Sequence, residues 1–126
     1  MMSAIPPSLH RWFQVHGIID LILGVPLLLF PQVVLGLLGL PAMEAVTARL
    51  VGAALLGIGG ASLYCRRKGK ESYSVLLKLK IIWSGSALLG LFLSLLGGAS
   101  TRLGIAVIIF ALFFTVWVYY QVRLSK

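Results

Sequence analysis

The chain has 126 residues, of which 60% are hydrophobic and only 11% are charged, with a formal net charge of +8. Soluble domains carry about 25% charged residues, so the composition excludes an ordinary soluble protein. The basic residues lie mainly at the ends of apolar stretches, which fits membrane topology and anionic headgroups, and we expect no nucleic acid as a partner. Cys65 is the single cysteine, which excludes an intrachain disulfide and a thiolate metal cluster.

The first predicted membrane span covers residues 9–30. Pro7 and Ser8 precede it, as is typical of a helix start, and the prolines and Arg11 before the apolar run do not resemble a cleavable signal. Pro26 removes a backbone hydrogen bond and predicts a kink. Residues 31–41 follow, apolar but too short to cross a membrane, and we expect an interfacial or re-entrant segment there.

Three more spans follow, at residues 42–64, 73–96 and 101–122. Pro41 and Glu44 suit the start of the second span, and a basic loop, residues 66–72, separates it from the third. Gly97 and Gly98 end the third span. The sequence therefore predicts an all-α fold, a four-helix transmembrane bundle forming a single domain over residues 1–126, with the short interfacial segment between its first two helices.

Basic residues predict the orientation of this bundle. If the N-terminus, the basic loop and the C-terminus share one side, Arg49 and Arg102 alone lie on the other side, and nine basic residues lie on the first: Arg11, Arg66, Arg67, Lys68, Lys70, Lys78, Lys80, Arg123 and Lys126. The positive-inside rule then places both termini in the cytoplasm, in a plasma membrane of bacterial or archaeal type. We expect lipid headgroups to bind the basic loop through Arg66, Arg67, Lys68 and Lys70.

The second span is dense in small residues that let helix backbones approach closely in lipid. The predicted helix-packing residues are Gly52, Ala53, Gly57, Gly60 and Ala61. Ser86, Gly90 and Ser94 form a similar face on the third span. Two interpretations stay open, namely packing inside the bundle and contact with another protein or another copy of this chain.

A histidine and an aspartate interrupt the first span. His16 and Asp20 are four residues apart and share one helix face, and Asp20 lies about 10 Å deep if the hydrocarbon begins near Phe13. Lys80 enters from the same side and is the expected partner of Asp20, unless it snorkels outward and leaves Asp20 to His16 or water. The three residues form either a polar cluster that ties the first helix to the third or a site that handles protons or cations. Gly17 and Gly24 flank Asp20, where another helix could come close.

No catalytic, metal or cofactor site is predicted. His10 and His16 lie on one helix, which does not suit intramolecular bis-histidine haem, and no second carboxylate or thiolate is near for a metal. No base is placed to activate a hydroxyl of Ser84, Ser86 or Thr115. An aromatic stripe on the fourth span suits packing better than a quinone or pigment slot, and comprises Phe110, Phe113, Phe114 and Trp117.

The layout GIIDLILGVPLLLFPQVVLGLLGLP, then ARLVGAALLGIG, then a basic loop resembles small four-helix membrane proteins of the broad DoxX-like type, over about residues 10–120. The resemblance rests on layout, without a specific motif. It implies a small membrane protein similar in some members to quinone-linked oxidoreductase subunits. It carries no catalytic residue onto this chain.

These observations predict a non-enzymatic membrane subunit that packs against a partner or against itself as an accessory component of a membrane complex. Membrane lipids and either other subunits or a homo-oligomer are the expected partners. One alternative is a small ion- or proton-coupled transporter or channel that uses Asp20 with His16 and Lys80. A further alternative is a quinone- or lipid-binding protein on the DoxX-like pattern.

Overall fold

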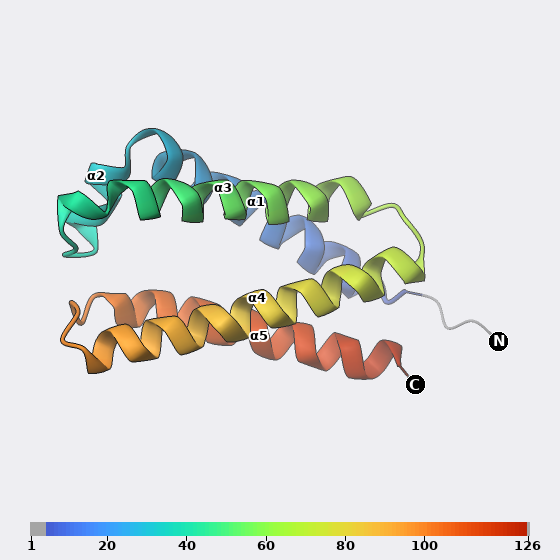
Figure 1. Ribbon diagram of the computed structural model, residues 1–126. Helices are drawn as coiled ribbons and strands as arrows, with labels where there is room; N and C mark the ends of the chain where they lie inside the picture. Colours follow the sequence, from blue (N-terminus) through green and yellow to red (C-terminus); the bar gives the residue numbers. More distant parts are fainter. Residues whose placement is uncertain (1–4, 126) are drawn as a thin grey trace. The chain divides into compact units, whose positions relative to one another are not determined.

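The computed structural model describes residues 5–125 and contains, within them, five α-helices and one short 3-10 helix (Figure 1). Four segments are long and apolar enough to cross a membrane, which indicates a multi-pass membrane protein. These segments are Pro7–Leu29, Ala42–Cys65, Lys70–Leu96 and Leu103–Leu124. The predicted all-α fold with four long apolar helices that could cross a membrane is therefore confirmed.

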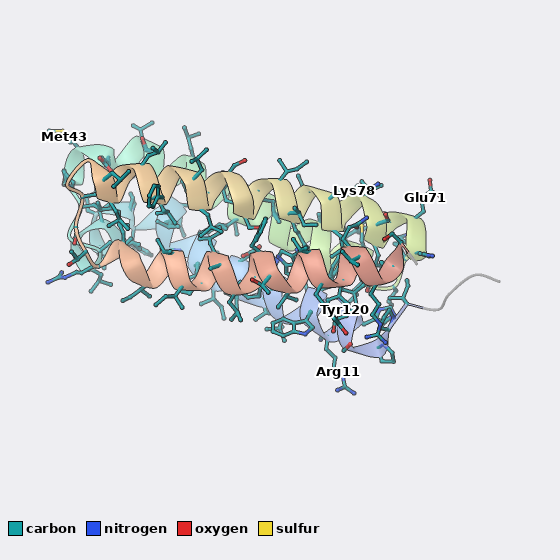
Figure 2. The ribbon with its side chains drawn as sticks, turned by 90° about the horizontal axis from the view of Figure 1, so that it is seen from below. Arg11, Met43, Glu71, Lys78 and Tyr120 are labelled. Carbon is teal, nitrogen blue, oxygen red and sulfur yellow. The ribbon has the colours of Figure 1, made fainter. Side chains whose placement is uncertain are left out.

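The chain divides into two compact units, and the first is Pro6–Arg67. It consists of α1 (Pro7–Leu29), α2 (Pro31–Leu37), the 3-10 helix η1 (Ala42–Glu44) and α3 (Ala45–Cys65). The helices α1 and α3 pack against each other in opposite directions, and α2 contacts both (Figure 1). Figure 2 shows Arg11 and Met43 at opposite ends of this unit.

Prolines set the boundaries of α1. Pro7 occupies the first turn, where its missing N–H costs nothing, and α1 remains one helix through Pro26. The helix ends at Leu29, where Phe30 leaves helical geometry with φ of −131° and donates its N–H to the Pro26 carbonyl at 2.7 Å. Pro31 then starts α2 in its own first turn.

The second unit holds α4 (Lys70–Leu96) and α5 (Leu103–Leu124), which pack against each other. Gly98 has φ of +92°, a conformation that side chains other than glycine rarely adopt, and this residue turns the chain between the two helices. The Trp83 ring meets Phe110 edge-on at 6.1 Å between centroids, which joins the middle of α4 to α5. Figure 2 shows Glu71 and Tyr120 toward the same end of this helix pair.

The helix boundaries lie within three residues of the predicted spans. The basic loop was predicted to extend to residue 72, but α4 begins at Lys70, with Gly69 as its N-cap and Glu71 in the first turn, where the helix dipole favours an acid. The segment predicted to lie at the interface is helical over Pro31–Leu37. The assembly of the four spans into one bundle stays a prediction.

Candidate functional site

Four glycines bring α1 and α3 into backbone contact. A Cβ added to Gly17 would lie 3.0 Å from the Gly59 carbonyl oxygen, and one added to Gly59 would lie 3.0 Å from the Gly17 carbonyl oxygen. Gly24 and Gly52 make the same reciprocal contact at 3.0 and 2.8 Å. Real Cβ atoms have almost no room at such distances, so only glycine permits this approach of the two helices.

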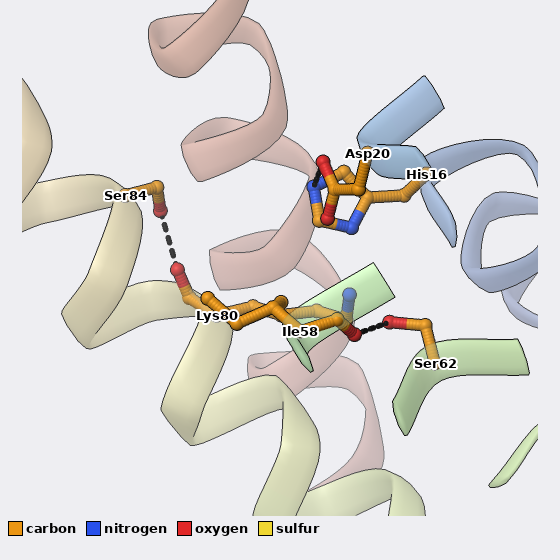
Figure 3. A network of polar contacts seen from close by, with 6 residues as sticks. All are labelled: His16, Asp20, Ile58, Ser62, Lys80 and Ser84. Atoms are coloured by element: carbon orange, nitrogen blue, oxygen red, sulfur yellow. Dashed lines mark hydrogen bonds and ion pairs between the residues drawn. The ribbon is translucent and has the colours of Figure 1, made fainter. Parts of the chain in front are cut away.

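The buried polar pair of α1 lies beside one of these glycine contacts. His16 Nε2 is 3.3 Å from Asp20 Oδ1, and both residues are buried, with exposed fractions of 5% and 3% (Figure 3). A Cβ on Gly59 would lie 2.6 Å from the Asp20 Cβ, so Asp20 rests directly on the backbone of α3. His16 and Asp20 share one face of α1 because they are four residues apart, and Asp20 on that face contacts α3.

Side-chain hydrogen bonds to backbone carbonyls join α1 and α3 at both ends. His10 Nδ1 donates to the Arg66 carbonyl at 2.8 Å, which connects the start of α1 to the end of α3. At the opposite end, Arg49 Nε donates to the Leu28 carbonyl at 3.2 Å. The last carbonyls of a helix have no hydrogen-bond partner within the helix. His10 and Arg49 each donate a hydrogen bond to one such carbonyl.

Lys80 belongs to the other unit, so its predicted pairing with Asp20 stays a prediction. Its Nζ lies 4.9 Å from the centroid of the Trp117 ring, a cation–π distance, and Lys80 is fully buried. The Trp117 ring in turn stacks on Phe113, with centroids 5.7 Å apart and planes 14° apart. The aromatic stripe of α5 thus packs on itself and on a lysine of α4.

Several hydroxyl groups in the spans bond to their own helix. Ser62 donates to the Ile58 carbonyl at 2.9 Å, and Ser84 donates to the Lys80 carbonyl at 2.6 Å (Figure 3). Thr115 donates to the Ala111 carbonyl at 2.9 Å. These bonds satisfy the hydroxyls in an apolar setting, and their geometry is that of structural serines and threonines rather than of activated nucleophiles.

The predicted packing residues of α3 lie on different faces. Gly52 is buried against α1, as is Gly59, which the sequence analysis did not select. A Cβ on Gly57 or Gly60 would meet no atom within 4 Å in the described chain, and Ala53 is exposed. Ala61 is half-buried. The seven-residue spacing of Gly17 and Gly24, matched by Gly52 and Gly59, was the signal that could have identified the inward face.

Arg66 in the basic loop has a local structural role. Arg66 donates from a terminal guanidinium nitrogen to the Leu63 carbonyl at 3.3 Å, which caps the last turn of α3. Arg67 and Lys68 are exposed, and Lys70 starts α4 half-buried. The loop therefore presents charge outward while part of it closes the preceding helix.

Within residues 5–125 no group of three or more His, Cys, Asp or Glu side chains is placed to hold a metal ion. In comparisons with known proteins the chain matches no family model, no curated protein and no solved structure. No family is thereby identified. Of the predicted resemblance to DoxX-like proteins, the structure supports only the layout, which is four long apolar helices consistent with a small four-span membrane protein.

Proposed function

We propose that this chain is a non-enzymatic subunit of a membrane complex, which associates with a partner helix or another copy through the outward face of α3. The observation that carries the proposal is the pair Gly57 and Gly60, which have no neighbour within 4 Å of an added Cβ in the described chain. Glycine in a helix interior costs roughly 0.5–1 kcal/mol relative to alanine, so glycines unused in the fold call for another reason.

The two glycine-bearing faces of α3 point in opposite directions. Gly52 and Gly59 lie on the buried face, in contact with α1, whereas Ala53 and Gly57, four residues apart, lie on the exposed one. Small residues at this spacing let a second helix approach closely in lipid, where packing rather than hydrophobicity drives association. The inward face shows that this helix already uses glycine for that purpose.

The test compares bulky and small substitutions at Gly57. Gly57→Ile fills space that is empty in the described chain, so we expect an unchanged melting temperature but loss of the complex. The complex is followed by mass photometry of the gently solubilised protein, with Gly57→Ala as the size control. A complex that survives Gly57→Ile, or wild-type protein that is monomeric and partner-free, would refute the proposal.

We propose the orientation and location predicted from the charges, with both termini and the basic loop in the cytoplasm. Four crossings return the chain to the side on which it began. Arg66, Arg67 and Lys68 lie between the second and third crossings, and Lys70 begins the third. The positive-inside rule and attraction to anionic headgroups both support this side.

A second candidate function is proton or cation handling, which the buried His16–Asp20 pair favours. An ionisable residue inside a membrane span is a functional-site hypothesis by default, and here the imidazole and the carboxylate are 3.3 Å apart. Lys80 is the third predicted member. Reconstitution of Asp20→Asn with measurement of proton and cation flux tests it, because flux equal to that of the wild type would remove Asp20 from any transport mechanism.

The quinone alternative has less support. Phe113 and Trp117, two of the aromatic residues that suggested a slot, stack on each other, and Lys80 covers the Trp117 ring. The Trp117 ring is therefore in contact with two side chains of its own unit, Phe113 and Lys80.

A further inference from the structure

At one end of the first unit α1 ends, α2 follows and α3 begins, and this region is here called the α2 end. The guanidinium of Arg49 is held there by a hydrogen bond. Arg49 Nε donates to the Leu28 carbonyl, and Leu28 is the residue before the last of α1. The 23 residues of α1 extend about 34 Å, slightly more than a hydrocarbon core of about 30 Å. The bond to Leu28 therefore places the Arg49 guanidinium near the level of the lipid headgroups.

The guanidinium keeps donors for a further ligand. Its Nε–H is used on Leu28, and the two terminal nitrogens carry four more N–H groups in a planar fork that matches two phosphate oxygens. Glu44 is the acid at this end, and it is exposed and forms no ion pair with Arg49 among the described residues. The bond to Leu28 fixes the side chain in advance, which lowers the entropy lost on binding.

Exposed apolar side chains lie on the elements of the α2 end. They are between 59% and 89% exposed and lie at the end of α1 and just after it, on α2, on η1 and at the start of α3: Leu29, Phe30, Val33, Leu37, Met43 and Val46. Such a surface beside a short helix of seven residues suits contact with acyl chains just below the headgroups. A soluble anion would engage the guanidinium and leave this surface unused.

We propose that the α2 end binds a membrane phospholipid, with its phosphodiester on the terminal nitrogens of Arg49 and its acyl chains against Phe30, Val33 and Leu37. This site is distinct from the basic loop, which joins α3 to α4 at the opposite end of α3. It requires neither the association through Gly57 nor ion handling by Asp20.

Native mass spectrometry of the purified full chain tests the proposal, with dioleoyl phosphatidylcholine as the probe. This lipid carries the phosphodiester without net charge, which limits its attraction to the basic loop. Arg49→Lys retains a donor for the Leu28 carbonyl but loses the fork, and we expect binding to weaken by about fivefold or more. The matched control is Arg102→Lys at the start of α5, which should bind as the wild type does.

Two further measurements separate phospholipid binding from its rivals. Dioleoylglycerol, which has the chains without the phosphate, and inorganic phosphate, which has no chains, should both bind much more weakly than the phospholipid. Val33→Asp, which leaves Arg49 and Leu28 in place, should also weaken phospholipid binding. Equal binding by Arg49→Lys and wild type, equal loss in Arg102→Lys, or equal binding of dioleoylglycerol would overturn the proposal.

Discussion

At the scale of single residues, Gly59 and Gly60 are chain neighbours with opposite surroundings. A Cβ on Gly59 would overlap the Asp20 Cβ at 2.6 Å, whereas one on Gly60 would meet nothing within 4 Å. Overpacking a close contact costs about 1–3 kcal/mol, so we expect Gly59→Ala to lower the free energy of unfolding by that amount. Gly60→Ala should leave it unchanged or raise it slightly.

The measurement for this pair is denaturation followed by circular dichroism in a mild detergent, with both variants purified identically. A Gly59→Ala protein as stable as Gly60→Ala would mean that α1 and α3 are not in backbone contact at this position. The comparison is well matched, because both substitutions add one methyl group to adjacent positions of the same helix.

Sequence alone could predict some of the site at this scale. The proximity of His16 and Asp20 follows from their spacing on one helix, which needs no knowledge of a neighbour. Gly57 and Gly59 lie in the same small-residue stretch, so composition does not distinguish them. To predict that Gly59 is the contact residue, one must know how α1 crosses α3. Composition predicts that a close contact exists, and only the mutual geometry of two helices selects its residues.

At the scale of elements, the pair α1–α3 is joined by a hydrogen bond at each end, and the two should act independently. His10→Ala removes the bond to the Arg66 carbonyl, and Arg49→Ala removes the bond to the Leu28 carbonyl. We expect each to cost up to about 1 kcal/mol, near the usual net value of such a bond and lower where it is exposed. Mutations so far apart should add within about 0.5 kcal/mol.

Hydrogen exchange locates these losses along the helices. His10→Ala should speed exchange at the last turn of α3, and Arg49→Ala should speed it at the last turn of α1, with the glycine contacts between them protected in both variants. Faster exchange over the whole of α1 in either single variant would contradict the independence of the two ends.

The spans themselves were the most predictable elements. Apolar length and proline positions predicted all four to within three residues, because in a membrane every backbone group must be bonded within the helix and the hydrocarbon sets its length. The start of α4 was less predictable. Lys70 and Glu71 are polar enough for a loop, but Gly69 caps a helix that includes them.

At the scale of the whole molecule, the basic loop should decide the orientation. An impermeant maleimide added to sealed cells should leave Cys65 unlabelled, and added to inverted vesicles it should label Cys65, which is half-exposed at the end of α3. Changing Arg66, Arg67, Lys68 and Lys70 together to glutamine should invert part of the population, because most of the charge bias is then removed.

Labelling of wild-type Cys65 in sealed cells would show the opposite orientation. A quadruple variant that remains entirely in the wild-type orientation would show that the remaining basic residues, among them Arg11 and Lys78, suffice to determine it. Permeabilised cells, in which Cys65 should be labelled in every variant, control for its reactivity.

The division into two compact units was not predicted. Hydropathy finds spans but does not say which of them pack together, since lipid-facing and helix-facing residues are equally apolar. The helices α1 and α3 pair where facing glycines, which have no side chain, let the two backbones approach closely. The helices α4 and α5 pair through aromatic contacts such as that of Trp83 with Phe110.

The two reciprocal glycine contacts also fix the register of α1 along α3. They lie seven residues apart on each helix, about 10 Å along the axis, so a slide of one turn would bring side chains against backbone at both places together. Piston-like sliding between these helices is therefore blocked. A movement of the first unit that preserves both glycine contacts would tilt α1 and α3 together.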